Sequence, residues 1–321
     1  MLVGTLFALA AGLMWGLVFV GPLILNDYPV VMLAFGRYLA FGLIALPLGW
    51  LDRASLRQFS RADWLDALKL SLVGNVLYYL FLASALQRAG GPLPSMIIGT
   101  LPVLIAIVAN RRNAARDGLL PWRQLAPALV LIALGLACVN QSELHALLND
   151  PHADLGRYAL GAVLALGALV CWTWYPIRNA DWLRHHSQRS PRSWATAQGL
   201  MTLPLALLGF ALTWAWLGTA QPDWPMPLGP RPGLYAGMML AIGLLASWAG
   251  TLCWNEASQR LPTSLAGQLI VFETLSALTY AYLWRGSWPD GLTLTGVALL
   301  IVGVSWGVRV KPVPESAEAP H

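Results

Sequence analysis

Residues 28–51 read YPVVMLAFGRYLAFGLIALPLGWL, and a single charged residue, Arg37, interrupts them. Asp27 and Asp52 bracket the stretch and are the nearest other charges along the chain. A helix needs about 20 consecutive apolar residues to cross the hydrocarbon core of a bilayer. The stretch therefore predicts a membrane-spanning helix over residues 30–51 that contains one cation.

The composition of the whole chain also indicates a membrane protein. Of its 321 residues, 57% are hydrophobic and 11% are charged, whereas charged residues make up about a quarter of a typical soluble domain. Apolar runs recur, and one of them, 261–284, contains only Glu273 as a charge. Period-2 alternation is absent, so we predict an all-α integral membrane protein rather than a β-barrel. The ten predicted transmembrane helices lie at about residues 3–25, 30–51, 66–88, 92–109, 124–141, 157–180, 193–217, 233–258, 262–284 and 290–309.

Lysines and arginines are divided unevenly between the two sides of these predicted spans. Of the 20 such residues, Arg37 lies within a span, and the odd-numbered connections hold Arg88, Arg157, Arg231 and Arg285. All the others lie in the even-numbered connections or the C-terminal tail. Because basic residues are retained on the cytoplasmic side, we place both the N- and C-termini in the cytoplasm. Membrane topology thus accounts for the net charge of +5, and we predict no nucleic-acid partner.

The two halves of the chain are weakly similar to each other. ASALQRAGGPLPS at residues 83–95 aligns with NEASQRLPTSLAG at 255–267, an offset of 172 residues (255 minus 83). Each half has five predicted spans, and an odd number makes the second half enter the membrane from the opposite side. We therefore predict a 5+5 inverted repeat, an arrangement that many secondary transporters use. Its parts are a first repeat at 1–141, an external connecting loop at 142–156, a second repeat at 157–310 and a disordered cytoplasmic tail at 311–321.

Polar residues recur at four-residue intervals in the third and eighth predicted spans. The third span has Ser71, Asn75 and Tyr79, and the eighth has Ser247, Thr251, Asn255 and Gln259. Such steps place side chains on one face of a helix, and polar groups inside a membrane turn toward protein or a wet cavity. We predict that the two spans line one central cavity. Hydrogen bonding between neighbouring helices is the alternative interpretation.

Together these features resemble the drug/metabolite transporter superfamily, in particular its EamA-type members. The resemblance rests on Trp15-Gly16, Arg37 followed by an aromatic residue, Ala85 and Pro102 in the hairpin of the third and fourth spans, and Glu273. The chain departs from the family's Glu-Pro pairs, because Leu101 precedes Pro102 and Thr274 follows Glu273. The resemblance implies transport of small metabolites, often amino acids or drug-like compounds, and frequently outward.

Apart from the charges at span ends that belong with the connections, three charged residues, Arg37, Glu256 and Glu273, lie within the predicted spans. A charge inside a membrane is costly, so each is a candidate for coupling or gating. Arg37 either ties helices together, contacts the substrate or pairs with Glu273. Glu256 lies near the cytoplasmic end of its span, where a side chain that reaches the interface is the simplest interpretation. A Glu273 carboxyl that exchanges a proton near neutral pH would couple protons to export.

Aromatic and polar residues deep in the predicted spans form the candidate substrate site. An aromatic cavity suits flat or cationic molecules, through stacking and cation–π contacts. The candidates for substrate binding are Trp15, Asn75, Tyr78, Tyr79, Thr100, Trp172, Tyr175, Trp248, Thr251 and Asn255.

The sequence lacks the signatures of several other classes of membrane protein. Lys69 and Lys311, the only lysines, lie outside any Gly-rich P-loop pattern, which argues against an ATP-driven pump. No histidines or cysteines are spaced as metal ligands. We therefore predict no metal, no cofactor and no enzymatic activity.

The sequence thus favours a secondary active exporter that works by alternating access. Its predicted partners are a small-molecule substrate, the lipid bilayer and protons, and a homodimer is left open. Arginine heavily outnumbers lysine, and alanine, leucine and glycine are abundant, which is typical of a GC-rich bacterial genome and favours a bacterial inner membrane. A passive facilitator, a non-transporting membrane subunit and a lipid-modifying enzyme are the alternatives.

Overall fold

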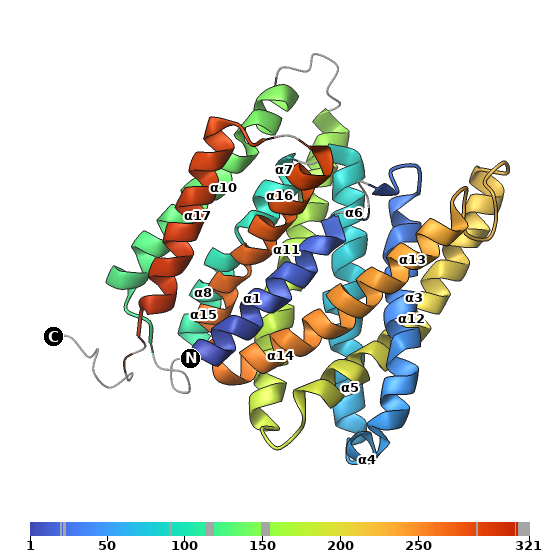
Figure 1. The fold of residues 1–321 in the computed structure, drawn as a ribbon, viewed down its shortest axis with the longest axis horizontal. Coiled ribbons are helices and arrows are strands. Elements are labelled where there is room, and N and C mark those ends of the chain that lie inside the picture. The colour runs from blue at the N-terminus through green and yellow to red at the C-terminus, as the bar shows by residue number, and fades with distance from the viewer. Residues whose placement is uncertain are drawn as a thin grey trace.

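The computed structural model describes residues 1–19, 21, 24–89, 92–112, 119–148, 155–286, 288–311 and 313. In this part of the chain all regular structure is helical, apart from one β-bridge between Leu119 and Val313. Figure 1 shows the helices side by side with tilted axes, as one bundle. The expectation of an all-α protein is confirmed.

The helical elements divide along the chain into two groups, those before residue 150 and those after it. The earlier ones are α1 (Leu2–Gly16), the 3₁₀ turn η1 (Leu17–Phe19), α3 (Val30–Leu51), α4 (Arg53–Leu56), α5 (Arg61–Leu70), the π-helix η2 (Ser71–Leu77), α6 (Tyr78–Ala89), α7 (Pro92–Gly99), α8 (Leu101–Arg112) and α10 (Trp122–Leu148). The later ones are α11 (Leu155–His185), α12 (Pro191–Ala220), α13 (Pro232–Ile242), the π-helix η3 (Gly243–Ala249), α14 (Gly250–Arg260), α15 (Thr263–Leu269), α16 (Val271–Arg285) and α17 (Gly291–Arg309).

Several stretches of helix are suited to a bilayer. Within the described residues, six are long and apolar enough to cross a membrane: Val30–Leu51, Arg61–Ala85, Trp122–Val139, Gly156–His185, Pro191–Ala220 and Pro232–Arg260. Leu2–Gly16 and Gly291–Gly307 are shorter apolar helices. This result supports a multi-pass membrane protein.

The helix boundaries agree with the sequence prediction best where a proline or a charge marks the end. α3 covers the predicted span 30–51 residue for residue. α10 continues to Leu148 and α11 starts at Leu155, so helix covers both ends of the expected connection 142–156. Its residues 149–154, and most of the expected tail 311–321, lie outside the described residues.

A capping box explains why the third predicted span begins five residues earlier than expected. The Ser60 hydroxyl accepts a hydrogen bond from the Asp63 backbone N–H (3.2 Å), and the Asp63 carboxylate accepts one from the Ser60 backbone N–H (2.7 Å). These bonds satisfy donors that a helix start leaves unpaired. α5 therefore begins at Arg61, and η2 and α6 continue it.

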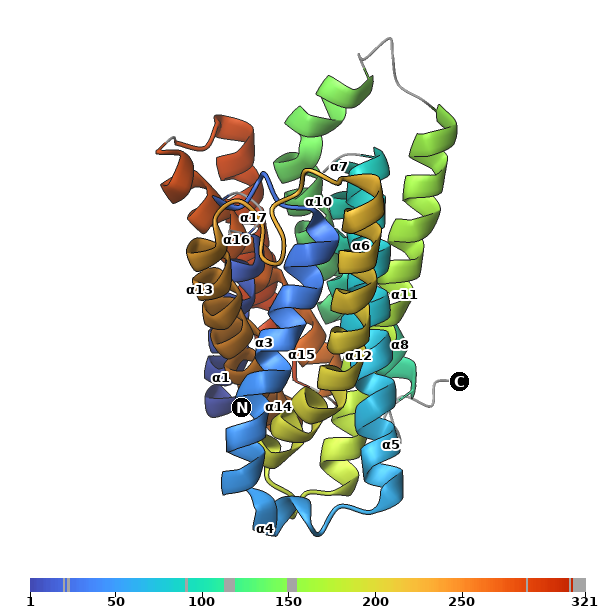
Figure 2. The same cartoon turned by 90° about the vertical axis from the view of Figure 1, so that its right-hand side faces the viewer.

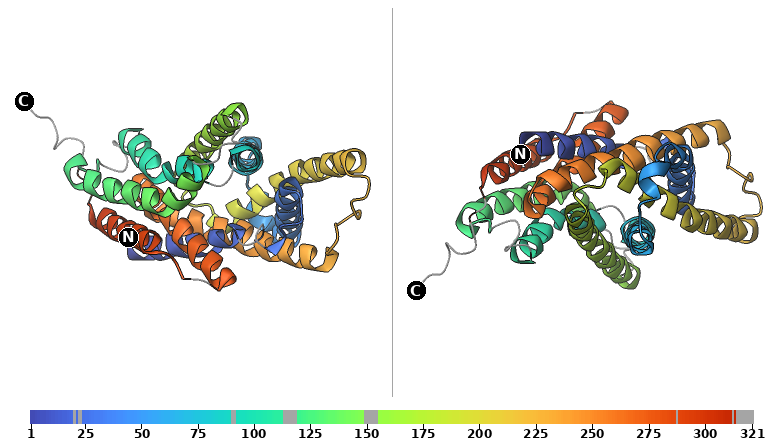
Figure 3. Two further views of the ribbon diagram at one scale, coloured as in Figure 1. Left: turned by 90° about the horizontal axis from the view of Figure 1, so that it is seen from above. Right: turned by 90° about the horizontal axis from the view of Figure 1, so that it is seen from below.

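The main helix pairs join the two parts of the chain. α3 packs against α12, α10 against α17, α6 against α11, α8 against α15, and α1 against both α14 and α16. Figure 2 shows α3 and α12 side by side. Seen from above and below in Figure 3, the bundle is elongated, with α12 and α13 at one end and α10 and α17 at the other.

The contact between α10 and α17 depends on two facing glycines. A Cβ added to Gly135 would lie 2.8 Å from the Gly296 carbonyl oxygen, and one added to Gly296 would lie 2.7 Å from the Gly135 carbonyl oxygen. Small residues allow membrane helices to approach closely, so that dispersion contacts hold them together.

The two π-helices occupy equivalent places in the sequence. η2 covers Ser71–Leu77 and η3 covers Gly243–Ala249, so each residue of η3 lies 172 positions after its counterpart in η2. This is the offset that aligned residues 83–95 with 255–267. π-helical turns are rare in proteins, and those that occur often lie at functional sites.

Contacts between connections gather the basic loops at one end of the bundle. The Arg189 guanidinium donates to the Gln58 side chain and backbone oxygens (2.6 Å each), and Arg192 lies 3.2 Å from Asp52. At the other end, Arg231 pairs with Asp27. The sequence places the first group in the cytoplasm and the second outside, and the structure keeps the two groups apart.

Candidate functional site

A cavity of about 190 Å³ lies among helices from both parts of the chain. We call it the central cavity. Helices α1, α3, α6, α11 and α16 and the π-helix η2 all contribute to its walls. Its lining residues are Trp15, Val18, Arg37, Tyr38, Gly74, Asn75, Tyr78, Tyr79, Leu82, Trp172 and Glu273.

Arg37 reaches the central cavity from α3 and is held by η3. Its Nε–H donates to the Ser247 hydroxyl oxygen over 2.9 Å, and its guanidinium carbon lies 4.9 Å from the centre of the Tyr38 ring. Ser247 is buried. Arg37 therefore joins two helices, as one interpretation of the sequence predicted, and still lines the central cavity. Five N–H donors on a guanidinium allow both roles.

Glu273 enters the central cavity from the first turn of α16, just after the break between α15 and α16 at Ile270. Within the described residues its carboxylate forms no hydrogen bond and no ion pair within 4.0 Å. Arg37 and Glu273 thus share one cavity but do not pair directly. Gly12 brings α1 close to this turn, because a Cβ there would lie 3.1 Å from the Glu273 backbone nitrogen.

Aromatic rings form much of the wall of the central cavity. Tyr78 stacks on Trp172 with ring centres 4.9 Å apart, and Trp172 stacks on Tyr175 at the same distance. Trp15 meets Trp172 edge to face at 5.8 Å. Stacked and edge-to-face pairs of this kind fix ring orientations. The wall therefore offers a defined aromatic surface with a cation and a carboxylate on it.

The structure brings many of the predicted residues to the central cavity. Trp15, Asn75, Tyr78, Tyr79, Trp172, Arg37 and Glu273 line it. Sequence reasoning missed four lining residues: Val18, Tyr38, Gly74 and Leu82. Tyr38 could have been found as the aromatic residue that follows Arg37, whereas Gly74, without a side chain, leaves no signal of this kind.

Other predicted substrate-site residues lie elsewhere. Thr100 is exposed in the break between α7 and α8, and its hydroxyl donates to the Ile97 carbonyl (2.6 Å). Trp248 donates to the Thr196 hydroxyl (3.2 Å). Neither of them, nor Tyr175, Thr251 or Asn255, is among the residues that line the central cavity. The prediction that the third and eighth spans line one cavity thus holds for Asn75 and Tyr79 but not for the eighth span, where Asn255 bonds to Asn179 and to the Pro191 carbonyl instead.

Glu256, the third charge in the predicted spans, is also outside the central cavity. Its carboxylate pairs with Arg260, one turn further along α14. An (i, i+4) pair at a helix end is typical of an interface residue. The interpretation of Glu256 as a side chain at the cytoplasmic interface agrees with this contact.

Asn255 belongs instead to a buried amide network that the sequence did not predict. The Asn179 Nδ2–H donates to Asn255 Oδ1 (2.8 Å), while Asn179 Oδ1 accepts from Trp194 Nε1–H (2.9 Å) and Gln198 Nε2–H (3.0 Å). We call these four residues, each at most 1% exposed, the Asn179 cluster. It joins α11, α12 and α14.

The Asn179 cluster connects to the central cavity through further hydrogen bonds. Tyr175 donates to Gln198 Oε1 (2.9 Å), and the Gln198 carbonyl accepts from Thr202 (2.7 Å). Thr202 in turn accepts a bond of 3.3 Å from Asn75, which lines the cavity. The network lies between the central cavity and the end of the bundle that the sequence places in the cytoplasm.

Comparison with known proteins identifies the family. The model of the EamA-like transporter family matches residues 2–112. The inner membrane protein YtfF of Escherichia coli (strain K12) is 55% identical over 313 residues, 97% of each chain. The chain belongs to the drug/metabolite transporter superfamily. It is a multi-pass protein of the bacterial inner membrane.

A solved crystal structure extends the similarity to three dimensions. Its TM-score to this member of the superfamily is 0.70 at 19% sequence identity, over 95% of this chain and 96% of the other. At that identity the likeness concerns the fold alone. The two proteins therefore share a fold over nearly the whole length of both chains, despite their low sequence identity.

Proposed function

We propose that the protein is a secondary active transporter that exports small zwitterionic metabolites, amino acids or related compounds, by alternating access. The observation that carries the proposal is the pair of opposite charges on one cavity without a direct bond between them. Arg37 suits a carboxylate, because a guanidinium binds it with two parallel hydrogen bonds. The Glu273 carboxylate suits an ammonium group.

The aromatic wall supports cargo with an apolar or aromatic side chain. Trp15, Tyr78 and Trp172 line the central cavity together with Arg37 and Glu273. A ring or alkyl group would stack there, and a cationic compound would gain from the ring faces. The cavity volume of about 190 Å³ favours a small metabolite over a large one.

The proposed mechanism rests on a ten-span, 5+5 inverted repeat. Three features support it. Residues 83–95 align with 255–267, η2 and η3 have the same offset, and a helix pair between the halves has an equivalent pair with the roles of the halves reversed. Under that repeat α1 on α14 corresponds to α11 on α6. Rocking of one half against the other would expose the central cavity to each side in turn.

The Asn179 cluster supports the assignment of a closed cytoplasmic side. It fills the region between the central cavity and the cytoplasmic ends of α11, α12 and α14 with hydrogen-bonded side chains. In the proposed cycle these bonds separate when the cavity opens to the cytoplasm. We also propose that Glu273 exchanges a proton during the cycle, because a carboxylate without a partner among the described residues is costly to keep charged inside a membrane and loses no bond when it is protonated.

Flux measurements on purified protein in proteoliposomes test the proposal. The probes are radiolabelled leucine, phenylalanine and the lipophilic cation tetraphenylphosphonium, each with and without an imposed pH gradient. We expect saturable exchange of an amino acid and its uphill movement when the gradient is present. Amino-acid exchange that does not respond to the gradient would identify a passive facilitator. Flux of tetraphenylphosphonium alone, or no flux of any probe, would contradict the proposed cargo class.

A further inference from the structure

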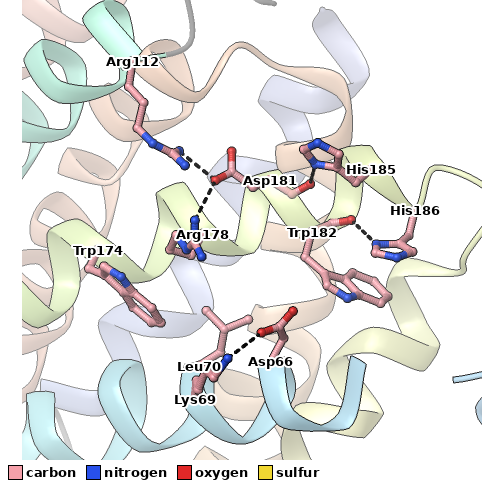
Figure 4. Close-up of a pocket in the computed structure, with 10 residues that line it drawn as sticks. All are labelled: Asp66, Lys69, Leu70, Arg112, Trp174, Arg178, Asp181, Trp182, His185 and His186. Atoms are coloured by element: carbon pink, nitrogen blue, oxygen red, sulfur yellow. Dashed lines mark hydrogen bonds and ion pairs between the residues drawn. The ribbon is translucent and has the colours of Figure 1, made fainter. Parts of the chain in front are cut away.

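A second hollow, of about 470 Å³, lies where the cytoplasmic ends of α5, α8 and α11 meet. Figure 4 shows its walls: side chains of α11 and Arg112 of α8 on one side, and those of α5 on the other. None of its lining residues lines the central cavity. We call it the cytoplasmic hollow, and it requires a separate explanation.

Two arginines of the cytoplasmic hollow converge on one acid. Arg112 Nη1 lies 2.7 Å from Asp181 Oδ2, and Arg178 Nη1 lies 3.9 Å from the same oxygen. The first distance is that of a charge-assisted hydrogen bond and the second is not. Arg178, whose side chain is 53% exposed, therefore keeps donors that can turn to a ligand.

The opposite wall is electrically balanced. Lys69 Nζ lies 3.2 Å from Asp66 on α5, three residues earlier in the same helix. Among the charged residues that line the cytoplasmic hollow, with its histidines neutral, the arginines and the lysine outnumber the two acids by one. The excess positive charge lies on the side of Arg112 and Arg178.

Tryptophans give the cytoplasmic hollow an apolar surface beside these charges. Trp182 is buried, its Nε1–H donates to Asp63 (3.0 Å), and its ring stacks on Trp194 with centres 3.5 Å apart. Trp174 lies two turns deeper along α11. Tryptophan beside arginine at the cytoplasmic membrane interface is the setting in which headgroup and acyl region of a lipid meet.

A tight helix contact lies at Gly74, which lines the central cavity but not the cytoplasmic hollow. The Tyr175 ring occupies the place that a Cβ on Gly74 would take, with its Cδ2 only 2.2 Å from that position. Tyr175 is buried and bonded to Gln198. Because no residue lines both hollows, we treat the cytoplasmic hollow as a site of its own rather than as part of the cargo site.

We propose that the cytoplasmic hollow binds a phosphate group through Arg178 and Arg112, carried by an anionic phospholipid of the inner leaflet or by free phosphate. Arginine binds phosphate oxygens with paired, parallel hydrogen bonds. Basic pockets between membrane helices on the cytoplasmic side are typical sites for anionic headgroups. Binding there would tie α8 to α11 and stabilise the closed cytoplasmic end.

Thermal unfolding of the full chain in nanodiscs tests this site and separates the two sources of phosphate. One arm compares phosphatidylcholine discs with discs that also contain phosphatidylglycerol. The other titrates sodium phosphate into phosphatidylcholine discs at constant ionic strength. We expect Tm to rise in at least one arm, and the rise to fall by at least half in Arg178→Gln. A response in the first arm identifies a lipid, and a response in the second identifies free phosphate.

Arg57→Gln is the matched control, because it removes the same charge from an exposed position on the same side. Its Tm response should equal that of the wild type. Equal responses of wild type, Arg178→Gln and Arg57→Gln, or no response in either arm, would overturn the proposal. Native mass spectrometry of the wild type, with phosphatidylglycerol expected to remain bound more than phosphatidylcholine, gives a second readout that needs no variant.

Discussion

The Asn179 cluster and the central cavity both contain polar side chains inside the helical bundle, but these side chains differ in whether they have hydrogen-bond partners. In the Asn179 cluster each amide of Asn179, Gln198 and Asn255 is hydrogen-bonded, and the residues are at most 1% exposed. In the central cavity, the Glu273 carboxylate has no hydrogen-bond or ion-pair partner among the described residues. Both regions contain groups that a membrane interior disfavours.

This difference in hydrogen bonding distinguishes polar residues that stabilise the fold from polar residues that serve function. A buried polar group whose bonds are complete stabilises the packing around it. A charged group without partners beside a cavity costs free energy, and inside a membrane such a group typically marks a functional site. Sequence spacing could not make this distinction, because Asn75 and Asn255 look alike in a four-residue pattern. The predictions below follow from it.

The largest loss of stability is expected for Asn179→Ala. The change leaves Trp194, Gln198 and Asn255 each with an unpaired buried group, at about 1–3 kcal/mol for each such group, so a total of about 3 kcal/mol is expected after relaxation. Thermal unfolding of the purified protein measures the effect. Gln124→Ala, at an exposed position of α10, is the control. A Tm for Asn179→Ala that equals the control would show that the cluster adds no stability.

A smaller loss, about 1 kcal/mol, is expected for Ser247→Ala, which removes the acceptor for Arg37 Nε–H. Because the guanidinium then loses its fixed orientation, the KM for an exported amino acid should rise several-fold. Ser71→Ala is matched to it, since Ser71 also lies in a π-helix and its hydroxyl donates to the Gln198 carbonyl (2.9 Å). Ser71→Ala should lower Tm similarly and leave KM unchanged. Equal KM values for both variants would contradict a role of Ser247 in positioning Arg37.

The sequence predicted much of the fold because its signals are local. The apolar run at residues 30–51 predicted both ends of α3 at the correct residue. The distribution of arginines separated the connections that the structure keeps at opposite ends of the bundle. Errors in helix ends have local causes as well. The early start of α5 follows from the Ser60–Asp63 capping box.

The candidate site was predicted less completely, because contacts between distant segments decide it. Arg37 and Glu273 stood out because a charge within a span is rare. Asn179 did not, since an asparagine near a helix end leaves no pattern in the sequence. Its partners, Trp194, Gln198 and Asn255, lie 15, 19 and 76 positions away along the chain.

Asp27→Asn should lower stability less than Ser247→Ala, because the pair with Arg231 is exposed and screened by salt. The hydrogen bond from Arg231 lowers the pKa of Asp27. A lowered folded pKa means that the contribution is present above the ordinary value of about 3.9 and is lost as pH falls through the folded value. The Tm difference from wild type should be measurable at pH 7 in low salt and shrink in 1 M NaCl. A difference that salt leaves unchanged would contradict this account.

Glu273→Gln should change stability least and transport most. The amide keeps the shape of the carboxyl, no bond within the described residues is lost, and a neutral group costs less to bury than a charge. We therefore expect Tm within about 2 °C of wild type or slightly higher. Uphill flux driven by a pH gradient should disappear, because an amide cannot exchange the proton.

Glu256→Gln is the control for that change, since it makes the same substitution at a carboxylate that pairs with Arg260 outside the central cavity. Gradient-driven flux should survive in Glu256→Gln and be lost in Glu273→Gln. Exchange without a gradient should persist in both, with a higher KM in Glu273→Gln, because an amide binds the ammonium group of the cargo less strongly than a carboxylate. If Glu273→Gln still responds to the gradient like the wild type, the carboxylate serves only to bind the ammonium group of the cargo. Its unbonded state in the central cavity would then be explained by substrate recognition alone, and proton coupling would have to reside elsewhere in the chain.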